Sequence, residues 1–537
     1  MNISKLIGSL LVLIFASTGW AVTWNIGDGE TYTTFTLLEA SEVLAGDDIV
    51  DGGGGTFTEI WYPATSGTSG HPITLQNATI DAGSARNVCI HLNANQDYIT
   101  IKNINTTGST GANIILSGDN TGITFENVTF TGGTYGVNMS TADGHVKSNI
   151  SIDSSTFTGQ SAANINWFVA GATGCATSNV SLTNLSVTNS TFSGSNTNGA
   201  IHVRAEAHAT CVPAFSGLVA TGNTFTTPPT AVNTIRIYDA NSEDDEDYYW
   251  GGGLNISNNT ITGGFSGILV VGFTTGTNII SNNTISGTTG VGGGILIFWS
   301  KGVDIYGNTI SDGTTATIDG GGIDIDHGNI GVNVYNNEVT NMTGQAGAQN
   351  SGFMVMVLDS QSVSVYNNIG NGNRTGIMQN GAGTLSQTGI KYYNNTFNGC
   401  LEFGFYIGTA INNTELAEIE FYNNYFTGDG SGTDLTDAST DGGTLLENYN
   451  GYYNFSTNNQ AGANNVAADP LFVNAAGGDF NLKTGSPAID AGVDLGDTYT
   501  YDYRGRNQDS FGSGWEIGAR IYPSRKIHRK ISGQGVY

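Results

Sequence analysis

A short phrase built around adjacent asparagines returns along this chain and constrains its fold more than any other feature. In its clearest form, LNISNNTITGG from Leu254, alternating apolar and polar residues lead into Asn-Asn and then into a second apolar position. Close copies begin at Asn278, Val303, Val332, Val363, Ile390 and Ile419, and looser copies begin at Ile123, Ile150 and Leu185. Self-similarity at a spacing of about 24 to 36 residues is typical of stacked-repeat folds.

Each repeat also carries a second short run that opens with glycine, such as GILVV at Gly267 and GGIDID at Gly321. Short alternating runs separated by Gly and Asn predict β-strands joined by turns. A unit this small cannot bury its own apolar face, so it must stack on the next copy, strand upon equivalent strand. The pattern predicts an all-β parallel β-helix of about twelve coils, with apolar ladders inside and hydrogen-bonded asparagine ladders at the corners. A β-sandwich is the alternative, but sandwiches do not repeat a corner phrase at this period.

The coil phrases resemble the PbH1 repeats of the right-handed parallel β-helix proteins, which include pectate, alginate and chondroitin lyases and many glycoside hydrolases. Residues 66–83, SGTSGHPITLQNATIDAG, resemble the entry segment of such proteins, and ADPLFVNAAGGDFNLKTGSPAIDAG from Ala468 resembles a bacterial closing segment. The last phrase departs from the usual Asp-Ile-Gly-Ala-Tyr-Glu-like ending to WEIGARIY. The resemblance implies a right-handed parallel β-helix acting on polysaccharide, although this fold hosts many chemistries.

Composition, the repeat and the resemblance to β-helix proteins together imply five segments. Residues 1–21 carry Lys5, an apolar run and small residues near Ala21, the pattern of a secretory signal. We expect an N-terminal entry and cap over 22–85, β-helix coils over 86–430, a closing segment over 431–522 and a basic tail over 523–537. The protein is therefore expected to be secreted or held at a bacterial cell surface.

The charge balance narrows the expected partners. Lys and Arg total 17 against 45 Asp and Glu, a formal net charge of −28. Nucleic acid binding needs a basic face, so we expect no nucleic acid partner. No run after the signal is long and apolar enough to span a membrane. The expected partner is an extracellular polysaccharide, bound by a monomer.

One outward face gathers the chain's cationic side chains. Side chains alternate along a strand, and Ile201 and Ile235 are expected to point inward. Every second residue, starting from the neighbour of each isoleucine, then points outward. That outward set holds His202, Arg204, His208, Arg236 and Tyr238, with Asp239 next to it. These residue types fit β-elimination from a uronate, which needs a neutralised carboxylate, a base and an acid. We assign binding of the uronate carboxylate to Arg204 and Arg236, the role of base to His202 or His208, and the role of acid to Tyr238.

Two alternatives for this cluster stay open. The resemblance to β-helix lyases, which often use a lysine or arginine as base, leaves that role open for Arg236, although arginine hardly ever deprotonates. An ordinary surface ion-pair network of Arg204 and Arg236 with Glu206 and Asp239 is the other reading.

An acidic rung further along the same face suggests a second chemistry. Asp324 and Asp326 are two residues apart on one strand, so both are expected to be exposed and about 7 Å apart. That spacing suits an inverting glycoside hydrolase, with His327 helping to orient the sugar. We expect these three to contact sugar hydroxyls and to be secondary to Arg236.

The middle of the face is expected to be an apolar and aromatic groove, because sugar rings stack on aromatic faces. Its expected lining is Leu269, Val271, Phe273, Leu296, Phe298 and Trp299. Covering of this strip by loops, such as the insertion from Asn241 to Gly253, is the alternative.

Two further sites are predicted. The acidic run after the Arg236 strand offers oxygen ligands suited to Ca²⁺: Glu243, Asp244, Asp245 and Asp247. A solvated acidic loop without a metal is the alternative for this run. Cys175 and Cys211 follow their strands at equal offsets in adjacent coils, which predicts a disulfide, whereas Cys89 and Cys400 should be unpaired.

Three functions are compatible with these features. A lyase is favoured over a glycoside hydrolase using Asp324 and Asp326. A non-catalytic adhesin or carbohydrate-binding β-helix would need only the stack, without convergent polar groups.

Overall fold

The computed structural model describes residues 21–139, 145–169, 180–194, 196–205, 213–226, 228, 232–239, 251–290, 292–314, 320–344, 352–381, 387–408, 418–438 and 445–522. The described residues are almost entirely β-strand and turn, with one short helix, α2 (Phe35–Ser41), capped by the Thr34 side chain. None of their helices is long and apolar enough to cross a membrane. Contacts divide the chain into two compact units, unit 1 (residues 1–264) and unit 2 (residues 265–537).

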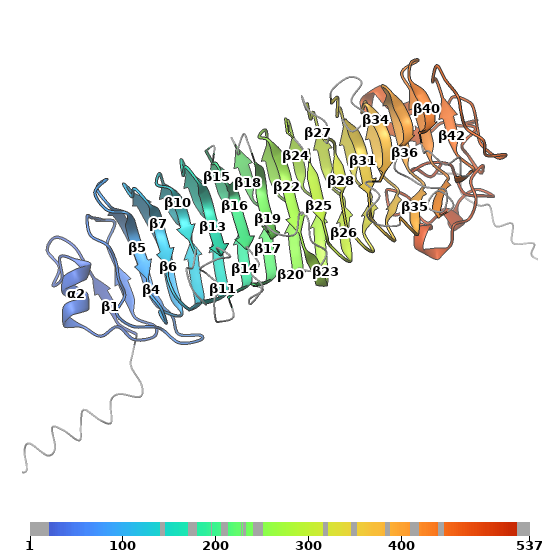
Figure 1. Ribbon diagram of the computed structural model, residues 1–537. Helices are drawn as coiled ribbons and strands as arrows, with labels where there is room; N and C mark the ends of the chain where they lie inside the picture. Colours follow the sequence, from blue (N-terminus) through green and yellow to red (C-terminus); the bar gives the residue numbers. More distant parts are fainter. Residues whose placement is uncertain are drawn as a thin grey trace, which may run out of the picture. The chain divides into compact units, whose positions relative to one another are not determined.

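Unit 1 consists of three rows of strands, and each strand pairs in parallel with its equivalent in the next repeat (Figure 1). The first row is β1 (Thr23–Asn25), β2 (Ile49–Asp51), β4 (Ile73–Asp81), β6 (Ile99–Thr107), β8 (Asn120–Glu126), β11 (Val146–Asp153), β14 (Ser181–Thr188), β17 (Ala214–Thr221) and β20 (Gly251–Ser257). The second is β3 (Thr56–Phe57), β9 (Thr129–Thr131), β12 (Thr156–Thr158), β15 (Thr191–Ser193), β18 (Thr224–Thr226) and β21 (Thr260–Thr262). The third, glycine-led row is β5 (Val88–Leu92), β7 (Ala112–Leu116), β10 (Tyr135–Asn138), β13 (Ala163–Val169), β16 (Gly199–Ala205) and β19 (Asn233–Asp239).

Unit 2 has the same three rows. The first is β23 (Phe273–Ser281), β26 (Val303–Tyr306), β29 (Asn333–Tyr335), β32 (Ser364–Tyr366), β35 (Ile390–Tyr393), β38 (Ile419–Tyr422) and β41 (Leu446–Asn448). The second is β24 (Thr284–Ser286), β27 (Thr309–Ser311), β30 (Glu338–Thr340), β33 (Ile369–Asn371), β36 (Thr396–Cys400), β39 (Tyr425–Gly428) and β42 (Gly451–Tyr453). The third is β22 (Ser266–Val271), β25 (Ile295–Phe298), β28 (Ile323–Ile325), β31 (Phe353–Leu358), β34 (Thr375–Asn380), β37 (Phe403–Ile407) and β40 (Thr433–Asp437). A hairpin, β43 (Phe472–Asn474) with β44 (Asp479–Leu482), follows, with single helical turns at Ala475–Gly477, Asp497–Tyr499 and Gln508–Ser510.

These parallel rows confirm the predicted β-helix, and within each unit the predicted isoleucines are in register, except at the position assigned to Phe353. Ile201 pairs with Ile235 in unit 1, and Ile268, Ile295 and Ile323 are in register in unit 2, all fully buried. The next member is Val355, whereas the prediction named Phe353, which lies two residues earlier on β31. The prediction that Phe353 points inward was right, but its place in the ladder was wrong by two residues.

Aromatic rings form a second ladder inside unit 1. Phe130, Phe157, Phe192 and Phe225 occupy the middle of consecutive second-row strands, with ring centroids 4.3, 4.8 and 4.7 Å apart and nearly parallel planes. Stacking at the strand spacing buries each ring between two others. The Thr-Phe-Thr pattern of these strands, Thr-Phe-Ser in β15, therefore places the ring inside the helix and the flanking hydroxyl residues outside.

The two adjacent asparagines of the repeat have different structural roles. The first one takes the left-handed conformation that turns the chain, as at Asn336 and Asn367, with φ of 54° and 56°. The second is buried, and its Nδ2 donates to Oδ1 of the equivalent residue in the next coil at 2.9–3.1 Å. This predicted corner ladder runs through Asn283, Asn308, Asn337, Asn368, Asn395, Asn424 and Asn450.

Breaking this ladder should destabilise unit 2. Asn337 donates to Asn368 Oδ1 and to the carbonyl of Ile305, and it accepts from the backbone and side chain of Asn308, all out of contact with water. Asn337→Ala leaves those buried groups without partners, so we expect a loss of about 3 kcal/mol in the free energy of unfolding. Chemical denaturation measures it, and the exposed Thr309→Ala in β27 is the control, with a change within about 0.5 kcal/mol. Equal losses in both variants would contradict a ladder-specific role.

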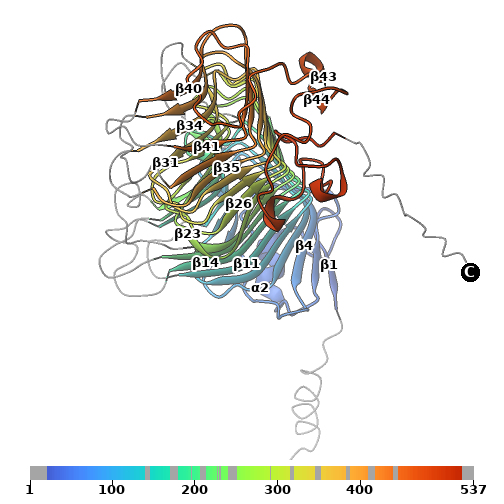
Figure 2. The ribbon, with the colours of Figure 1, turned by 90° about the vertical axis from the view of Figure 1, so that its right-hand side faces the viewer.

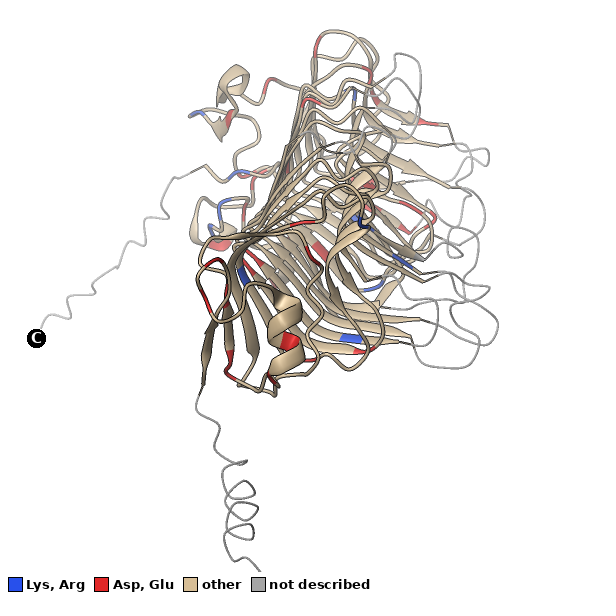
Figure 3. Cartoon of the chain, turned by 90° about the vertical axis from the view of Figure 1, so that its left-hand side faces the viewer, with Lys and Arg blue, Asp and Glu red and all other residues tan. Residues whose placement is uncertain are grey.

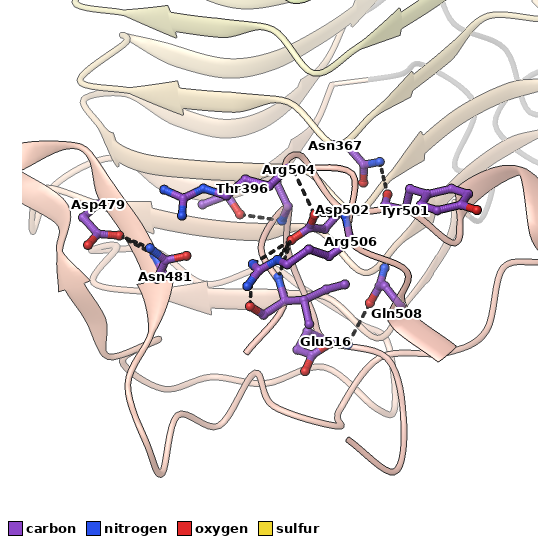
Figure 4. A network of polar contacts seen from close by, with 12 residues as sticks. Asn367, Thr396, Asp479, Asn481, Tyr501, Asp502, Arg504, Arg506, Gln508 and Glu516 are labelled. Carbon is purple, nitrogen blue, oxygen red and sulfur yellow. Dashed lines mark hydrogen bonds and ion pairs between the residues drawn. The ribbon is translucent and has the colours of Figure 1, made fainter. Parts of the chain in front are cut away.

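The last part of the closing segment, residues 499–519, packs against earlier strands of unit 2 (Figure 2). The Tyr499 ring meets the rings of Tyr366 and Tyr393 edge-on, at 5.1 and 4.8 Å. The backbone N–H of Ala519 donates to Thr396 Oγ1 at 2.8 Å. Within the segment, Arg506 forms a forked pair with the buried Asp502 carboxylate at 2.9 and 2.7 Å (Figure 4). The segment thus anchors itself to the coils through both aromatic and polar contacts.

Glu516, in the same network, makes the stability of this segment depend on pH. Its side chain is fully buried. Burial, and then the nearby Asp490 charge, raise its pKa to about 8. Between pH 4.5 and about 8 the folded chain therefore binds a proton that the unfolded chain has lost, so stability falls as pH rises through this window.

Glu516→Gln removes that proton uptake. We expect wild type and variant to have similar stability near pH 5 and the variant to gain by up to about 1.4 kcal/mol per pH unit as pH rises toward 8. Denaturation curves at several pH values measure the difference. A variant whose stability runs parallel to wild type at every pH would contradict the assignment.

Candidate functional site

The predicted cationic residues lie on adjacent third-row strands of unit 1, β16 and β19, next to β13. Strand register places Asn166, His202 and Arg236 in one column. A second column, two residues along, contains Phe168, Arg204 and Tyr238. With Tyr135 and Asn198, the two columns line a hollow of about 160 Å³ on the outward side of this row.

His202 is the most enclosed group in the hollow. The prediction had it exposed, but only 4% of its surface is accessible because Asn166, Arg236 and Tyr238 surround it. Its Nδ1 lies 2.7 Å from Asn166 Oδ1, and no described residue bonds to its Nε2. Burial lowers the pKa of the imidazole to about 3, and the charges of Arg236 and Arg204 add to the effect. The ring is therefore neutral near pH 7, with one nitrogen available to accept a proton.

Tyr238 lies between the two arginines. The Arg236 guanidinium carbon is 4.2 Å from the centre of the Tyr238 ring, and that of Arg204 is 5.5 Å away. Arg204 also lies 5.1 Å from the Phe168 ring. Lys and Arg are sparse among the described residues (Figure 3), so two guanidinium groups in one hollow form an unusual local positive field in an acidic protein.

Several predicted site residues fall outside the described part of the chain. His208, the calcium candidates Glu243, Asp244, Asp245 and Asp247, and the disulfide candidates Cys175 and Cys211 all lie there, as does the side chain of Asp239. Cys89 and Cys400 are free and buried, which confirms the prediction that they are unpaired. Among the described residues no group of three His, Cys, Asp or Glu side chains could hold a metal ion.

The acidic rung of unit 2 differs from the prediction. Asp324 was expected to be exposed but is only 1% accessible, in register between Leu296 and Met356, which are also buried. Asp326 is partly accessible and accepts from His327 through both the backbone N–H and ring Nδ1. This contact raises the pKa of His327. The two aspartates therefore do not share an open face.

The predicted aromatic groove is also absent from the described residues of unit 2. Leu269, Val271, Phe273, Leu296 and Trp299 are all buried. Residues before β25 fold over Leu296, since a Cβ on Gly292 would lie 2.6 Å from its Cδ2 atom. The Trp299 ring lies against the turn at Gly328, so it packs the fold and offers no platform for a sugar. Phe298 remains partly accessible and stacks at 6.5 Å on His327.

Four lining residues of the hollow were missed by the sequence analysis: Tyr135, Asn166, Phe168 and Asn198. Extending the outward alternation one coil toward the N-terminus would have found Asn166 and Phe168, because they precede His202 and Arg204 in register. Tyr135 and Asn198 lie at strand ends, where the alternation of side chains does not predict which way a residue points.

Comparison with known proteins returned structures alone, since no protein-family model and no curated protein matches this chain. A GH136 lacto-N-biosidase from Eubacterium ramulus is 11% identical, covering 86% of this chain and 70% of that chain, with a TM-score of 0.37. An alginate lyase, AlyF-OU02 in complex with G6, is 11% identical, covering 71% and 86%, with a TM-score of 0.36. A PL6 family polysaccharide lyase from Pseudopedobacter saltans is 13% identical, covering 83% and 92%, with a TM-score of 0.29. At these values the comparisons assign no activity.

Proposed function

We propose that the chain is a secreted lyase that cleaves a uronate-containing polysaccharide by β-elimination in the hollow of unit 1. The observation that carries this proposal is the convergence of two guanidinium groups, a neutral buried imidazole and a tyrosine on one small cavity. β-Elimination from a uronate needs a group that neutralises the carboxylate, a base for the C5 proton and an acid for the leaving oxygen.

Each side chain has a defined part in the reaction. Arg204 and Arg236 hold the uronate carboxylate and stabilise the charge that develops on it when C5 loses its proton. His202 Nε2 accepts that proton. The C4–O glycosidic bond then breaks, a C4=C5 double bond forms, and the Tyr238 hydroxyl protonates the leaving oxygen. The proton taken up by His202 then passes to Tyr238, directly or through solvent, so that both groups return to their starting states.

Substrate binding improves His202 as a base. In the unliganded protein the Arg236 and Arg204 charges contribute to its low pKa. A bound carboxylate offsets those charges, so the imidazole becomes more basic only when the substrate is in place. Burial is the largest cause of the low pKa of His202, and it remains in the complex.

Two other functions give different results in the same experiment. A hydrolase using Asp324 and Asp326 would create reducing ends without double bonds, and a carbohydrate-binding protein would create neither. Calcium bound by the acidic run at 243–247 stays a separate prediction, which the mechanism above does not use.

The mature chain should be incubated with a panel of uronate polymers and with the same polymers after reduction of their carboxyl groups. We expect one double bond, detected by ultraviolet absorbance, for each new reducing end. We expect no cleavage of the polymers whose carboxyl groups were reduced to alcohols. Reducing ends without double bonds would contradict the lyase proposal, as would equal cleavage of the reduced polymers.

A further inference from the structure

A column of polar side chains leads into His202 from the neighbouring coils. Asn138 on β10, Asn166 on β13 and His202 on β16 are in register. Asn166 donates from Nδ2 to Asn138 Oδ1 at 2.8 Å and presents its own Oδ1 to His202 Nδ1 at 2.7 Å. Asn166 and His202 are both almost fully buried.

The direction of these bonds decides where the histidine carries its proton. An amide oxygen can only accept, so the proton of the neutral imidazole must be on Nδ1, which leaves Nε2 with a free lone pair. A half-turn of the Asn166 amide is disfavoured, because it would face the NH₂ group toward Nδ1 and the oxygen toward the oxygen of Asn138. The column therefore selects one of two tautomers that differ little in free energy in water.

An asparagine suits this position better than an aspartate. A carboxylate next to Nδ1 would stabilise the doubly protonated imidazolium, in which Nε2 is no longer a base. A neutral amide orients the ring without that charge, in a hollow where Arg204 and Arg236 already disfavour an imidazolium.

We propose that Asn166, oriented by Asn138, is a positioning residue that keeps the proton of His202 on Nδ1 and so makes Nε2 the base of the elimination. The catalytic part of this inference rests on the proposed lyase function. The tautomer itself is a property of the resting protein and can be measured without any substrate.

The measurement is nitrogen NMR of protein labelled with ¹⁵N-histidine, with the His202 signals identified by their loss in His202→Gln. The chain has seven histidines, so the spectrum is simple enough to assign. We expect His202 to have a protonated Nδ1 and a bare Nε2 in wild type, and mixed tautomers in Asn166→Leu. Asn105→Leu, which removes an exposed amide in the same unit, should leave the His202 signals unchanged.

Activity provides the second readout. Asn166→Leu should lower kcat by about 10- to 100-fold with little change in KM. Asn166→Asp keeps the acceptor toward Nδ1 and loses the donor toward Asn138, and it should move the acid limb of kcat/KM to higher pH. A wild-type His202 protonated on Nε2, or a tautomer unchanged in Asn166→Leu, would overturn the inference. Absence of turnover on every polymer, with the expected tautomers, would instead count against the lyase function alone.

Discussion

Replacing His202 by glutamine is expected to lower kcat on a uronate polymer by about 10²- to 10⁴-fold, the usual contribution of a general base. Glutamine keeps a polar side chain of similar length but cannot accept the C5 proton. KM should change little, because the carboxylate is held by Arg204 and Arg236. Steady-state kinetics and direct measurement of polymer binding separate the two effects.

His91→Gln is the matched control, since His91 lies on β5 of the same row and does not line the hollow.

The pH profile adds a second check. With the pKa of unliganded His202 near 3, kcat/KM should show no loss from this group between pH 5 and 7. The acid limb of kcat, which reports the complex, should lie at higher pH than that of kcat/KM. An acid limb of kcat/KM near pH 6.5 that disappears in His202→Gln would contradict the assigned environment.

Arg236→Ala should have the second largest effect, a fall in kcat/KM of about 10²- to 10³-fold. Arg236 lies beside His202 in register and its guanidinium lies over Tyr238, so its charge is placed where the uronate carboxylate must bind. Its Nε is buried without a partner among the described residues, which leaves a donor for that carboxylate. Arg236→Lys should recover only part of the activity, because an ammonium lacks the forked donors of a guanidinium.

Arg86→Ala removes the same charge from an exposed position in unit 1 and controls for the general field of the protein. It should leave kcat/KM within about twofold, since exposed charges are screened by salt. Equal losses in Arg86→Ala and Arg236→Ala would mean that net charge matters and that the hollow does not.

The repeat phrase was sufficient to predict the β-helix and most of its ladders. Alternation fixes whether a side chain points inward, so Ile201, Ile235 and Ile323 could be placed without a structure. The error at Phe353 has a simple cause. A shift of two residues preserves every inward and outward direction, so the pattern cannot detect it, and only the pairing of Ile323 with Val355 reveals it.

Burial could not be predicted in the same way. The sequence places His202, Asp324 and Trp299 on the outward side, but their exposure depends on what the turns and neighbouring coils place over them. Asn166 and Tyr238 enclose His202, and the Gly328 turn covers Trp299. The outward cluster was therefore predictable as a set of residues, whereas its shape as a closed hollow was not.

The most direct test of the central claim compares Arg236→Ala with Asp324→Asn on one cleaved polymer, counting double bonds and reducing ends. We expect Arg236→Ala to lose nearly all formation of both, and folded Asp324→Asn to keep turnover within about threefold and still form one double bond per end. Loss of turnover in Asp324→Asn with only weaker binding in Arg236→Ala would place the chemistry in unit 2 and identify a hydrolase.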